Sequence, residues 1–179
     1  LEEINNPDTV KEFSNLSDQE LDRIENLIQN LLKIAKLDSS DNILDKKLEN
    51  ISEIMENLEK QFSYRAKNEA KNLYFSGDKE LYLLCDKLWI TESIGNIIKN
   101  ALDHTSDGNN IYISWKKFAS IIQITIEDDG SGIHPEDLHY IFKRFYRSRF
   151  SKDTKGIGLG LSLTKTIIEA HNGSIEVDS

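Results

Sequence analysis

The spacing of hydrophobic residues changes once along this 179-residue chain, near residues 38–42. Before that point the hydrophobic residues follow a broad heptad pattern made by Leu21, Ile24, Leu27, Ile28, Leu31, Ile34 and Ala35. A stripe this wide suits a helical bundle better than a two-stranded coiled coil. We predict one long helix over about residues 7–37, with Asn6 as its cap and Pro7 in its first turn. A capping box at Ser17–Glu20 offers an alternative start.

Beyond the polar linker at 38–42 the pattern is mixed α and β. Helical spacing predicts three helices, over residues 48–67, 89–105 and 164–173. Alternating or β-branched residues predict four short strands, over residues 72–76, 80–85, 111–115 and 121–126. The last two strands are joined by a short loop and should form an antiparallel hairpin. We expect an α+β sandwich with its helices on one face of the sheet, and Gly173 as the left-handed end of the last helix.

Composition excludes several classes of protein. A net charge of −9 argues against nucleic acid as a partner, because binding a phosphate backbone requires a basic face. The single Cys85 excludes an intramolecular disulfide and, among apolar neighbours, is predicted to be a buried structural thiol. No apolar run approaches the length of a membrane helix. The chain starts at Leu1 and stops after a strand-like segment, so we expect a piece of a larger protein.

Two polar clusters are candidate sites. Four polar residues on the helix predicted over 89–105 lie three or four positions apart and share one face: Glu92, Asn96, Asn100 and Asp103. This face is either simply solvated or offers the Asn100 carbonyl oxygen to a hard cation such as Mg²⁺. After the strand over 121–126 comes Asp128-Asp129-Gly130-Ser131-Gly132, which is either a plain turn or a turn whose glycines admit a flat ligand beside Asp128.

Two further clusters follow along the chain. Residues 142–155 gather aromatic and basic side chains, which fit either a solvated loop or an anion clamp. Gly156, Gly158 and Gly160 then alternate with aliphatic residues before the last predicted helix. They fit either a glycine-softened buried strand or a backbone that approaches a phosphate at a helix N-terminus. The spacing matches neither a Walker P-loop nor a dinucleotide fingerprint.

The order of these clusters resembles one known family. "ITESIGNIIKNALDHT", "EDDGSGI", "IFKRFYRS" and "KGIGLGLSLTKTIIEAHNGSIEV" resemble the N-box, first glycine box, F-box and second glycine box of bacterial sensor histidine kinases. The resemblance implies a catalytic ATP-binding domain over 41–179 with a two-layer α/β sandwich of the Bergerat type. It also implies that residues 1–40 belong to a helical-hairpin dimerisation and phosphotransfer domain, mainly its second helix.

The resemblance also implies roles for single residues. Asn96, Asn100 and Arg147 would be catalytic, with Asn100 holding Mg²⁺ and Arg147 reaching the triphosphate. Asp128 would accept a hydrogen bond from the adenine amino group. The other positions implied to contact the nucleotide are His104, Gly130, Gly132, Ile133, Phe142, Gly156, Ile157, Gly158, Leu159, Gly160 and Leu161. Residues from about 134 to 155 would form a lid over ATP.

The implied activity is transfer of the γ-phosphoryl group of ATP to a histidine, and from there to an aspartate of a response regulator. The implied cofactors are ATP and Mg²⁺, and the implied assembly is a homodimer through the N-terminal helices. We expect a cytoplasmic location, with membrane attachment only through parts outside this chain. One alternative is a nucleotide-binding dimerisation module without kinase activity. Another is a related ATPase or protein-serine kinase, which the heptad-bearing helix disfavours.

Three departures from the family pattern bear on these expectations. First, no histidine has the context of a phosphoacceptor, so we expect the acceptor on a helix that precedes Leu1. Second, Asp103 stands where many relatives carry a lysine, and it would repel phosphate unless it faces away. Third, we expect the final strands of the fold to follow Ser179.

The four histidines carry separate expectations. His104 either contacts the nucleotide or caps its helix, and His171 interacts with the end of its helix. His134 and His139 are expected to face solvent. Their scattered spacing gives little support to a zinc site.

Overall fold

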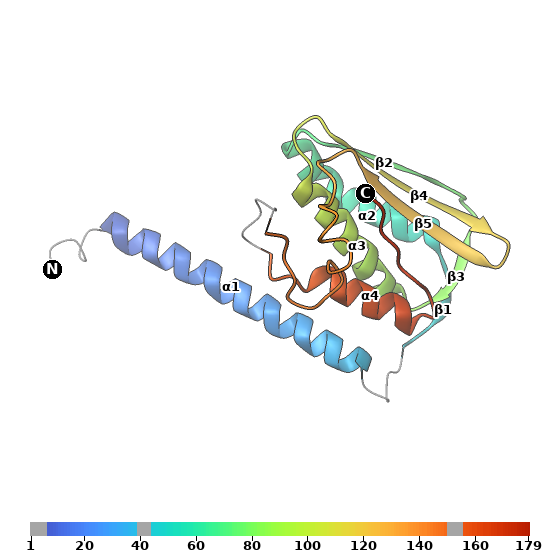
Figure 1. Cartoon of the computed structure of the whole chain (residues 1–179), viewed down its shortest axis with the longest axis horizontal. Helices are drawn as coiled ribbons and strands as arrows, with labels where there is room; N and C mark the ends of the chain where they lie inside the picture. The colour runs from blue at the N-terminus through green and yellow to red at the C-terminus, as the bar shows by residue number, and fades with distance from the viewer. Residues whose placement is uncertain (1–6, 39–43, 150–155) are drawn as a thin grey trace.

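The computed structural model describes residues 7–38, 44–149 and 156–179. The elements in chain order are α1 (Pro7–Asp38), β1 (Lys47–Asn50), α2 (Ile51–Asn68), β2 (Asn72–Gly77), β3 (Tyr82–Cys85), α3 (Lys87–His104), β4 (Asn110–Phe118), β5 (Ile121–Asp128) and α4 (Gly160–Ala170) (Figure 1). The long helix, the hairpin and the alternation of helices with strands are confirmed. The Asn6 cap and most of the linker lie outside the described residues.

The strands form two sheets. β1 pairs with β3 in antiparallel orientation, whereas β2, β4 and β5 form a three-stranded sheet. In that sheet β2 runs parallel to β4, and β4 and β5 form the predicted antiparallel hairpin, with Ile113 opposite Ile126. Helices α2 and α3 lie along one face of the sheet (Figure 1), while Tyr74 and Tyr112 stack on the other, with ring centroids 5.1 Å apart. The predicted two-layer sandwich is therefore confirmed.

The hydrophobic core lies between the sheet and the helices. Strand β4 contributes Ile111, Ile113 and Trp115, which alternate along the strand and so face the same side. The helices contribute Ile51, Ile54, Met55, Leu58, Ile94, Ile98, Leu102, Leu163 and Ile167. Cys85 is also buried, and burial raises the pKa of its thiol to about 11, as expected for a structural cysteine.

Two boundary predictions were wrong. Leu48 does not belong to a helix: it lies in β1 opposite Leu84 and is 68% exposed. The helix begins at Ile51 because Asn50 caps it, its side chain accepting a hydrogen bond from the Ser52 amide at 2.8 Å. The cap at Asn50 therefore starts the helix three residues later than the hydrophobic spacing predicts.

The end of α4 also differs from the prediction. The left-handed residue is Asn172, with φ 60°, and not Gly173. The Gly173 amide donates to the Ile168 carbonyl at 2.9 Å, so the helix closes as a Schellman motif with asparagine in the left-handed position. Residues 174–179 do not form a strand, although the sequence there is strand-like.

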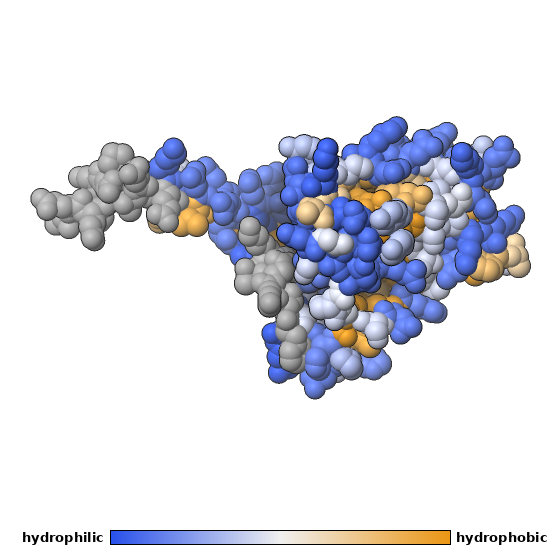
Figure 2. All heavy atoms as spheres, turned by 90° about the horizontal axis from the view of Figure 1, so that it is seen from above, coloured by the Kyte–Doolittle hydropathy of each residue, from blue (hydrophilic) through white to orange (hydrophobic). Residues whose placement is uncertain are grey.

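Helix α1 packs against α4 through its C-terminal turns only. Ile34 and Leu37 are buried there, and the ion pairs Lys33–Glu92 (2.5 Å) and Arg144–Asp38 (2.6 Å) border the contact. Towards the other end, hydrophobic side chains remain exposed, and Figure 2 shows them at the surface near the start of α1. Among the described helices, none has the length and apolar character needed to cross a membrane.

Candidate functional site

Helix α3 positions the two asparagines of the polar stripe. The Asp86 side chain caps this helix by accepting from the Leu88 amide at 3.1 Å, and Ile94 and Ile98 fix its buried face. Asn96 and Asn100 consequently lie beside that face and are half-buried. Neither side chain forms a hydrogen bond with another described residue. Both amides are thus available to a ligand.

Asp103, the acid at the lysine position, pairs with a residue of α2. Its carboxylate accepts a hydrogen bond from the Arg65 guanidinium of α2 at 2.5 Å. Arg65 also binds Glu69 at 2.6 Å, and Glu69 binds Lys71. Asp103 therefore belongs to a surface ion-pair network between α2 and α3, and Arg65 balances its charge.

The turn after β5 packs against the end of α3. The Gly130 amide donates to Asp128 Oδ1 at 3.0 Å. A Cβ on Gly130 would lie 2.7 Å from that oxygen and 3.1 Å from the His104 carbonyl oxygen, so a side chain there would displace the Asp128 carboxylate. This close approach brings Asp128 next to the C-terminal end of α3, where Asn100 lies.

Asp129 has a separate, structural role. It accepts hydrogen bonds from the Asn110 amide and from the Asn109 and Asn110 side chains, at 2.7 Å in each case. The bonds from Asn110 are the main reason why the pKa of Asp129 is lowered. Of the two adjacent aspartates, Asp129 holds the start of β4, and Asp128 remains the candidate ligand.

The aromatic–basic segment contacts the second glycine box. Phe145 has φ 63° and donates its amide to the Gly158 carbonyl at 2.9 Å. Gly158 has φ 76°, and a Cβ there would lie 2.5 Å from the Tyr146 carbonyl oxygen. From the same segment, the Phe142 ring lies 6.0 Å from Lys165 Nζ on α4. Arg147 is exposed on this turn.

Residues 156–160 lead directly into α4, so the interpretation as a glycine-softened strand is wrong. Leu159 is buried, Ile157 packs against the core, and Leu161 is half-buried in the first turn. The N-terminus of α4 has no side-chain cap, which leaves backbone N–H groups of its first turn available to an anion. Gly160 has open space around its missing Cβ.

The remaining predicted positions flank this region. The His104 residue is exposed at the end of α3, and its backbone carbonyl oxygen lies against the Gly130 turn. Gly132 has φ 71°, and the neighbouring Ile133 amide donates to the Ser179 hydroxyl at 2.7 Å. The turn after Asp128 thus meets the C-terminal end of α3, and α4 packs along α3, where the Thr164 hydroxyl donates to the Ser93 carbonyl at 3.3 Å. Residues 150–155 of the predicted lid lie outside the described residues.

His171 connects α4 to α3 at the opposite end of this pair. The Asp86 amide donates to His171 Nε2 at 3.0 Å, and Nδ1 lies 2.8 Å from the Ile167 carbonyl oxygen. Burial lowers the pKa of the imidazole, so the neutral form donates from Nδ1. The predicted contact with the helix end is present, but it is made by a neutral ring. His134 and His139 are exposed, as expected.

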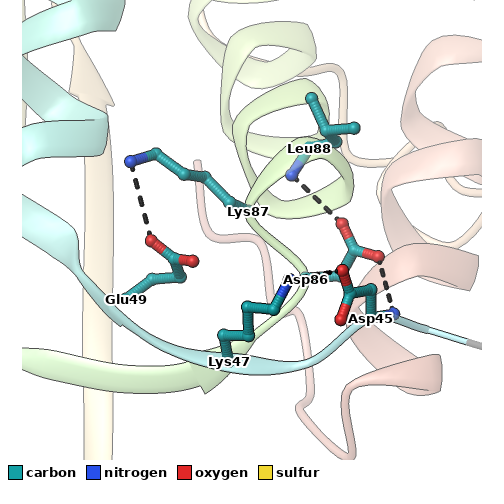
Figure 3. Close-up of a pocket in the computed structure, with 6 residues that line it drawn as sticks. All are labelled: Asp45, Lys47, Glu49, Asp86, Lys87 and Leu88. Atoms are coloured by element: carbon teal, nitrogen blue, oxygen red, sulfur yellow. Dashed lines mark hydrogen bonds and ion pairs between the residues drawn. The ribbon is translucent and has the colours of Figure 1, made fainter.

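A charged hollow of about 140 Å³ near His171 is distinct from the candidate site (Figure 3). It is lined by Asp45, Lys47, Glu49, Asp86, Lys87 and Leu88. Its side chains are satisfied locally: Lys47 binds Asp45 at 2.6 Å, and Asp86 accepts from the Asp45 amide at 3.0 Å. The hydrogen bonds that Asp86 accepts here stabilise the start of α3.

The donor set fits a magnesium nucleotide. In the described parts of the chain, three or more His, Cys, Asp or Glu residues never gather into a metal-binding group. An amide oxygen is nevertheless a suitable Mg²⁺ ligand, because this ion keeps waters and phosphate oxygens around one or two protein ligands. Asn100 would supply that oxygen.

Comparisons with known proteins agree on one family. Residues 85–179 match the family described as histidine kinase-, DNA gyrase B-, and HSP90-like ATPase. The sensor histidine kinase CusS of Escherichia coli strain K12 is 32% identical over 169 residues, which are 93% of this chain and 35% of CusS. The chain therefore spans about a third of the length of such curated relatives.

Two solved structures share the fold. The histidine kinase AdeS of Acinetobacter baumannii has a TM-score of 0.71 at 25% identity, covering 92% of this chain and 75% of that one. The histidine kinase ThkA, crystallised with the response regulator protein TrrA, has a TM-score of 0.74 at 24% identity, covering 94% of this chain and 47% of that one.

Proposed function

Because the chain belongs to the histidine kinase-, DNA gyrase B- and HSP90-like ATPase family, we propose that it is the ATP-binding catalytic core of a sensor histidine kinase. Residues 41–179 would be the catalytic domain, and residues 1–40 part of the dimerisation and phosphotransfer domain. The observation that carries the proposal is that Asn96 and Asn100 have no hydrogen-bond partner among the described residues, on a helix that packs against α4 and whose C-terminal end meets the turn after Asp128.

Binding of the nucleotide would begin with its base. Asp128 accepts a hydrogen bond from the Gly130 amide on one oxygen, and its carboxylate has capacity for a further donor such as the adenine amino group. The phosphates would extend towards the N–H groups at the start of α4.

Catalysis would consist mainly of positioning and charge stabilisation. Asn100 would hold Mg²⁺, which when bound offsets negative charge on the phosphates. Arg147 would bind the triphosphate as a bidentate donor. Asn96 is an amide and not a carboxylate, so it cannot activate a water molecule as a base, which favours transfer to a neutral imidazole over hydrolysis.

The phosphoryl acceptor would be a histidine on a helix outside this chain, since the four histidines present lie at or beyond the end of α3. The product phosphohistidine would pass its group to an aspartate of a response regulator. ThkA, whose fold this chain shares, was crystallised with such a protein. We further propose a homodimer through α1 and its missing partner helix, in a cytoplasmic part of a membrane-attached sensor.

The alternative of an inactive nucleotide-binding module rested on Asp103. Its carboxylate is paired with Arg65 at 2.5 Å and so need not repel phosphate. This pair removes the specific reason to prefer a module without kinase activity.

Calorimetric titration with Mg-ATP tests the site directly. Asn100→Ala should weaken binding by at least about tenfold while the unfolding temperature stays unchanged, because the residue is half-buried and unpaired. Asn57→Ala, the same change on the exposed side of α2, is the matched control and should bind like the wild type. Equal affinity of all three proteins would refute the assignment.

Incubation of the full-length protein with radiolabelled ATP tests the transfer. A phosphoprotein that is labile in acid and stable in base supports the kinase. Binding of Mg-ATP without any labelled protein would leave only a nucleotide-binding module.

A further inference from the structure

We propose that Asp137 is a positioning residue that holds Arg147 in place for the triphosphate. The inference rests on the proposed function, because it assigns Arg147 to the nucleotide. Asp137 belongs to none of the motifs. It lies in the segment between β5 and α4, and its acidic side chain is only 3% exposed. A buried carboxylate is costly unless hydrogen bonds satisfy it.

The partners of Asp137 lie on both sides of Arg147. The Tyr146 hydroxyl donates to Asp137 Oδ1 at 2.5 Å, and the Ser148 side chain also hydrogen-bonds to the carboxylate. One buried carboxylate therefore anchors the residue before Arg147 and the residue after it. With both neighbours held, the backbone at Arg147 has little freedom, although its own side chain is exposed.

The backbone of Asp137 is fixed as well. Its amide donates to the His134 carbonyl at 2.8 Å, and its own carbonyl accepts from the Tyr140 amide at 2.7 Å and the Ile141 amide at 3.0 Å. The carboxylate therefore projects from a rigid turn. Because Asp137 lies on a rigid turn, the hydrogen bond that it accepts from the Tyr146 hydroxyl can fix the position of Tyr146.

A second contact holds the turn that carries Arg147. The Phe145 amide donates to the Gly158 carbonyl at 2.9 Å, which ties the turn to the residues that lead into α4. Asp137 and Gly158 thus fix the position of Arg147 relative to the start of α4. That is where the phosphates are proposed to lie.

The carboxylate is ionised in this setting. Hydrogen bonds from Ser148 and Tyr146 lower the pKa of Asp137, and they outweigh the opposing effect of burial. The hydroxyls therefore donate to a charged acceptor, and such bonds are stronger than those between neutral groups. Its Oδ2 atom is buried and lacks a hydrogen-bond partner within the described parts of the chain.

Asp137→Asn tests the inference because it keeps the shape and removes the charge. With the full chain and calorimetry, Mg-ATP affinity should fall about tenfold, whereas affinity for adenosine should not change, since Arg147 acts on phosphates only. Glu136→Gln is the matched control, because it removes the charge of the exposed acid that directly precedes Asp137. This variant should bind both ligands like the wild type.

A double-mutant cycle separates positioning from a merely structural role. If Asp137 acts through Arg147, then Asp137→Asn should cost nothing further in an Arg147→Ala background. Additive losses would overturn the inference, as would unchanged Mg-ATP affinity of Asp137→Asn.

Two milder variants guard against unfolding. Tyr146→Phe and Ser148→Ala each remove one donor, and together they should reproduce the selective loss of Mg-ATP affinity; wild-type affinity in that double variant would overturn the inference. Failure of the wild type to bind any Mg-ATP would instead refute the proposed function, so the two failures are distinguishable.

Discussion

At the scale of single residues, His171 makes the stability of the fold depend on pH. Its ring accepts from the Asp86 amide and bonds to the Ile167 carbonyl, and burial lowers its pKa below the ordinary value of 6.5. In the unfolded chain the ring binds a proton at a higher pH than in the folded chain. The stabilisation is therefore complete above about pH 6.5 and is lost progressively as the pH falls below that value.

Urea unfolding of the wild type and of His171→Gln at about pH 7.5 and about pH 5.5 measures this contribution. We expect the wild type to lose more stability than the variant between the two conditions. A variant that loses as much as the wild type would show that other groups cause the pH dependence.

Gly158→Ala should disturb the contact between the aromatic–basic segment and α4. The glycine has φ 76°, and a Cβ would approach the Tyr146 carbonyl oxygen to 2.5 Å. We expect a loss of about 1–3 kcal/mol in the free energy of unfolding, measured by chemical denaturation. Gly95→Ala is the matched control: its Cβ would meet Leu58 at an ordinary 3.4 Å inside α3, so it should be neutral or stabilising.

Several residue-level features could not be read from the sequence. The left-handed Asn172 was hidden because the following Gly173 is the commoner residue for that conformation. Asp103 departs from the family pattern, but its partner Arg65 is 38 positions away in the sequence, and their pairing depends on the packing of α2 on α3. Asp137 gave no signal, because a single acid in a polar segment is ordinarily exposed.

At the scale of elements, the docking of α1 is open to a charge-exchange experiment. Lys33 on α1 binds Glu92 on α3 at 2.5 Å, and both are partly exposed, so the pair contributes only about 0.2–1 kcal/mol. Lys33→Glu should lower the population of docked α1 by repulsion, and Lys33→Glu with Glu92→Lys should restore it. Arg23→Glu, whose partner Glu20 lies on α1 itself, is the control.

Energy transfer between dyes on cysteines introduced at the exposed Lys11 and Lys117 reports the docking. The native Cys85 is buried with a pKa of about 11 and should not react with the dyes. Identical transfer in Lys33→Glu and the wild type would mean that Ile34 and Leu37 hold the helix without the ion pair.

Elements with strong local periodicity were predictable, and those defined by distant partners were less so. α1 has seven stripe positions, and hydrophobic residues alternate at Ile111, Ile113 and Trp115 of β4 and at Ile122, Ile124 and Ile126 of β5. Each of these elements is therefore recognisable from its local sequence. β1 has only four residues, "KLEN", and exists because it pairs with β3, some 35 positions later. Its one hydrophobic residue was therefore assigned to the following helix.

At the scale of the whole molecule, α1 leaves a hydrophobic surface without a partner. The stripe residues Leu21, Ile24, Ile28 and Leu31 are exposed, although Ile34 and Leu37 of the same helix are buried on α4. We expect self-association through this surface to make the sedimentation coefficient rise with concentration. Ile24→Lys with Ile28→Lys should sediment as a monomer at all concentrations.

Glu25→Lys with Gln29→Lys, which changes two exposed polar positions of the same helix turns, is the control. It should associate like the wild type. Association that survives Ile24→Lys with Ile28→Lys would place the interface elsewhere.

The candidate site was predictable as a set of segments but not as an arrangement. The order of the four motifs predicts that Asn100, Asp128 and the glycines around 158 act together, and this stays a prediction. Their proximity depends on non-local packing, such as Gly130 against the His104 carbonyl and Phe145 on Gly158. Each of those contacts joins segments that the sequence separates by loops.

The bridge at His171 has a mechanical consequence for the opposite end of the molecule. α3 begins where α4 ends, so the two helices run antiparallel and are fastened together at Asp86 and His171. α4 has 11 residues and is about 16 Å long, which makes it a lever arm between that fastening and Gly160. A tilt of a few degrees about the fastened end would shift Gly160 by about 1 Å relative to α3. The spacing between Gly160 and Asn100 therefore depends in part on an imidazole at the far end of the helix pair.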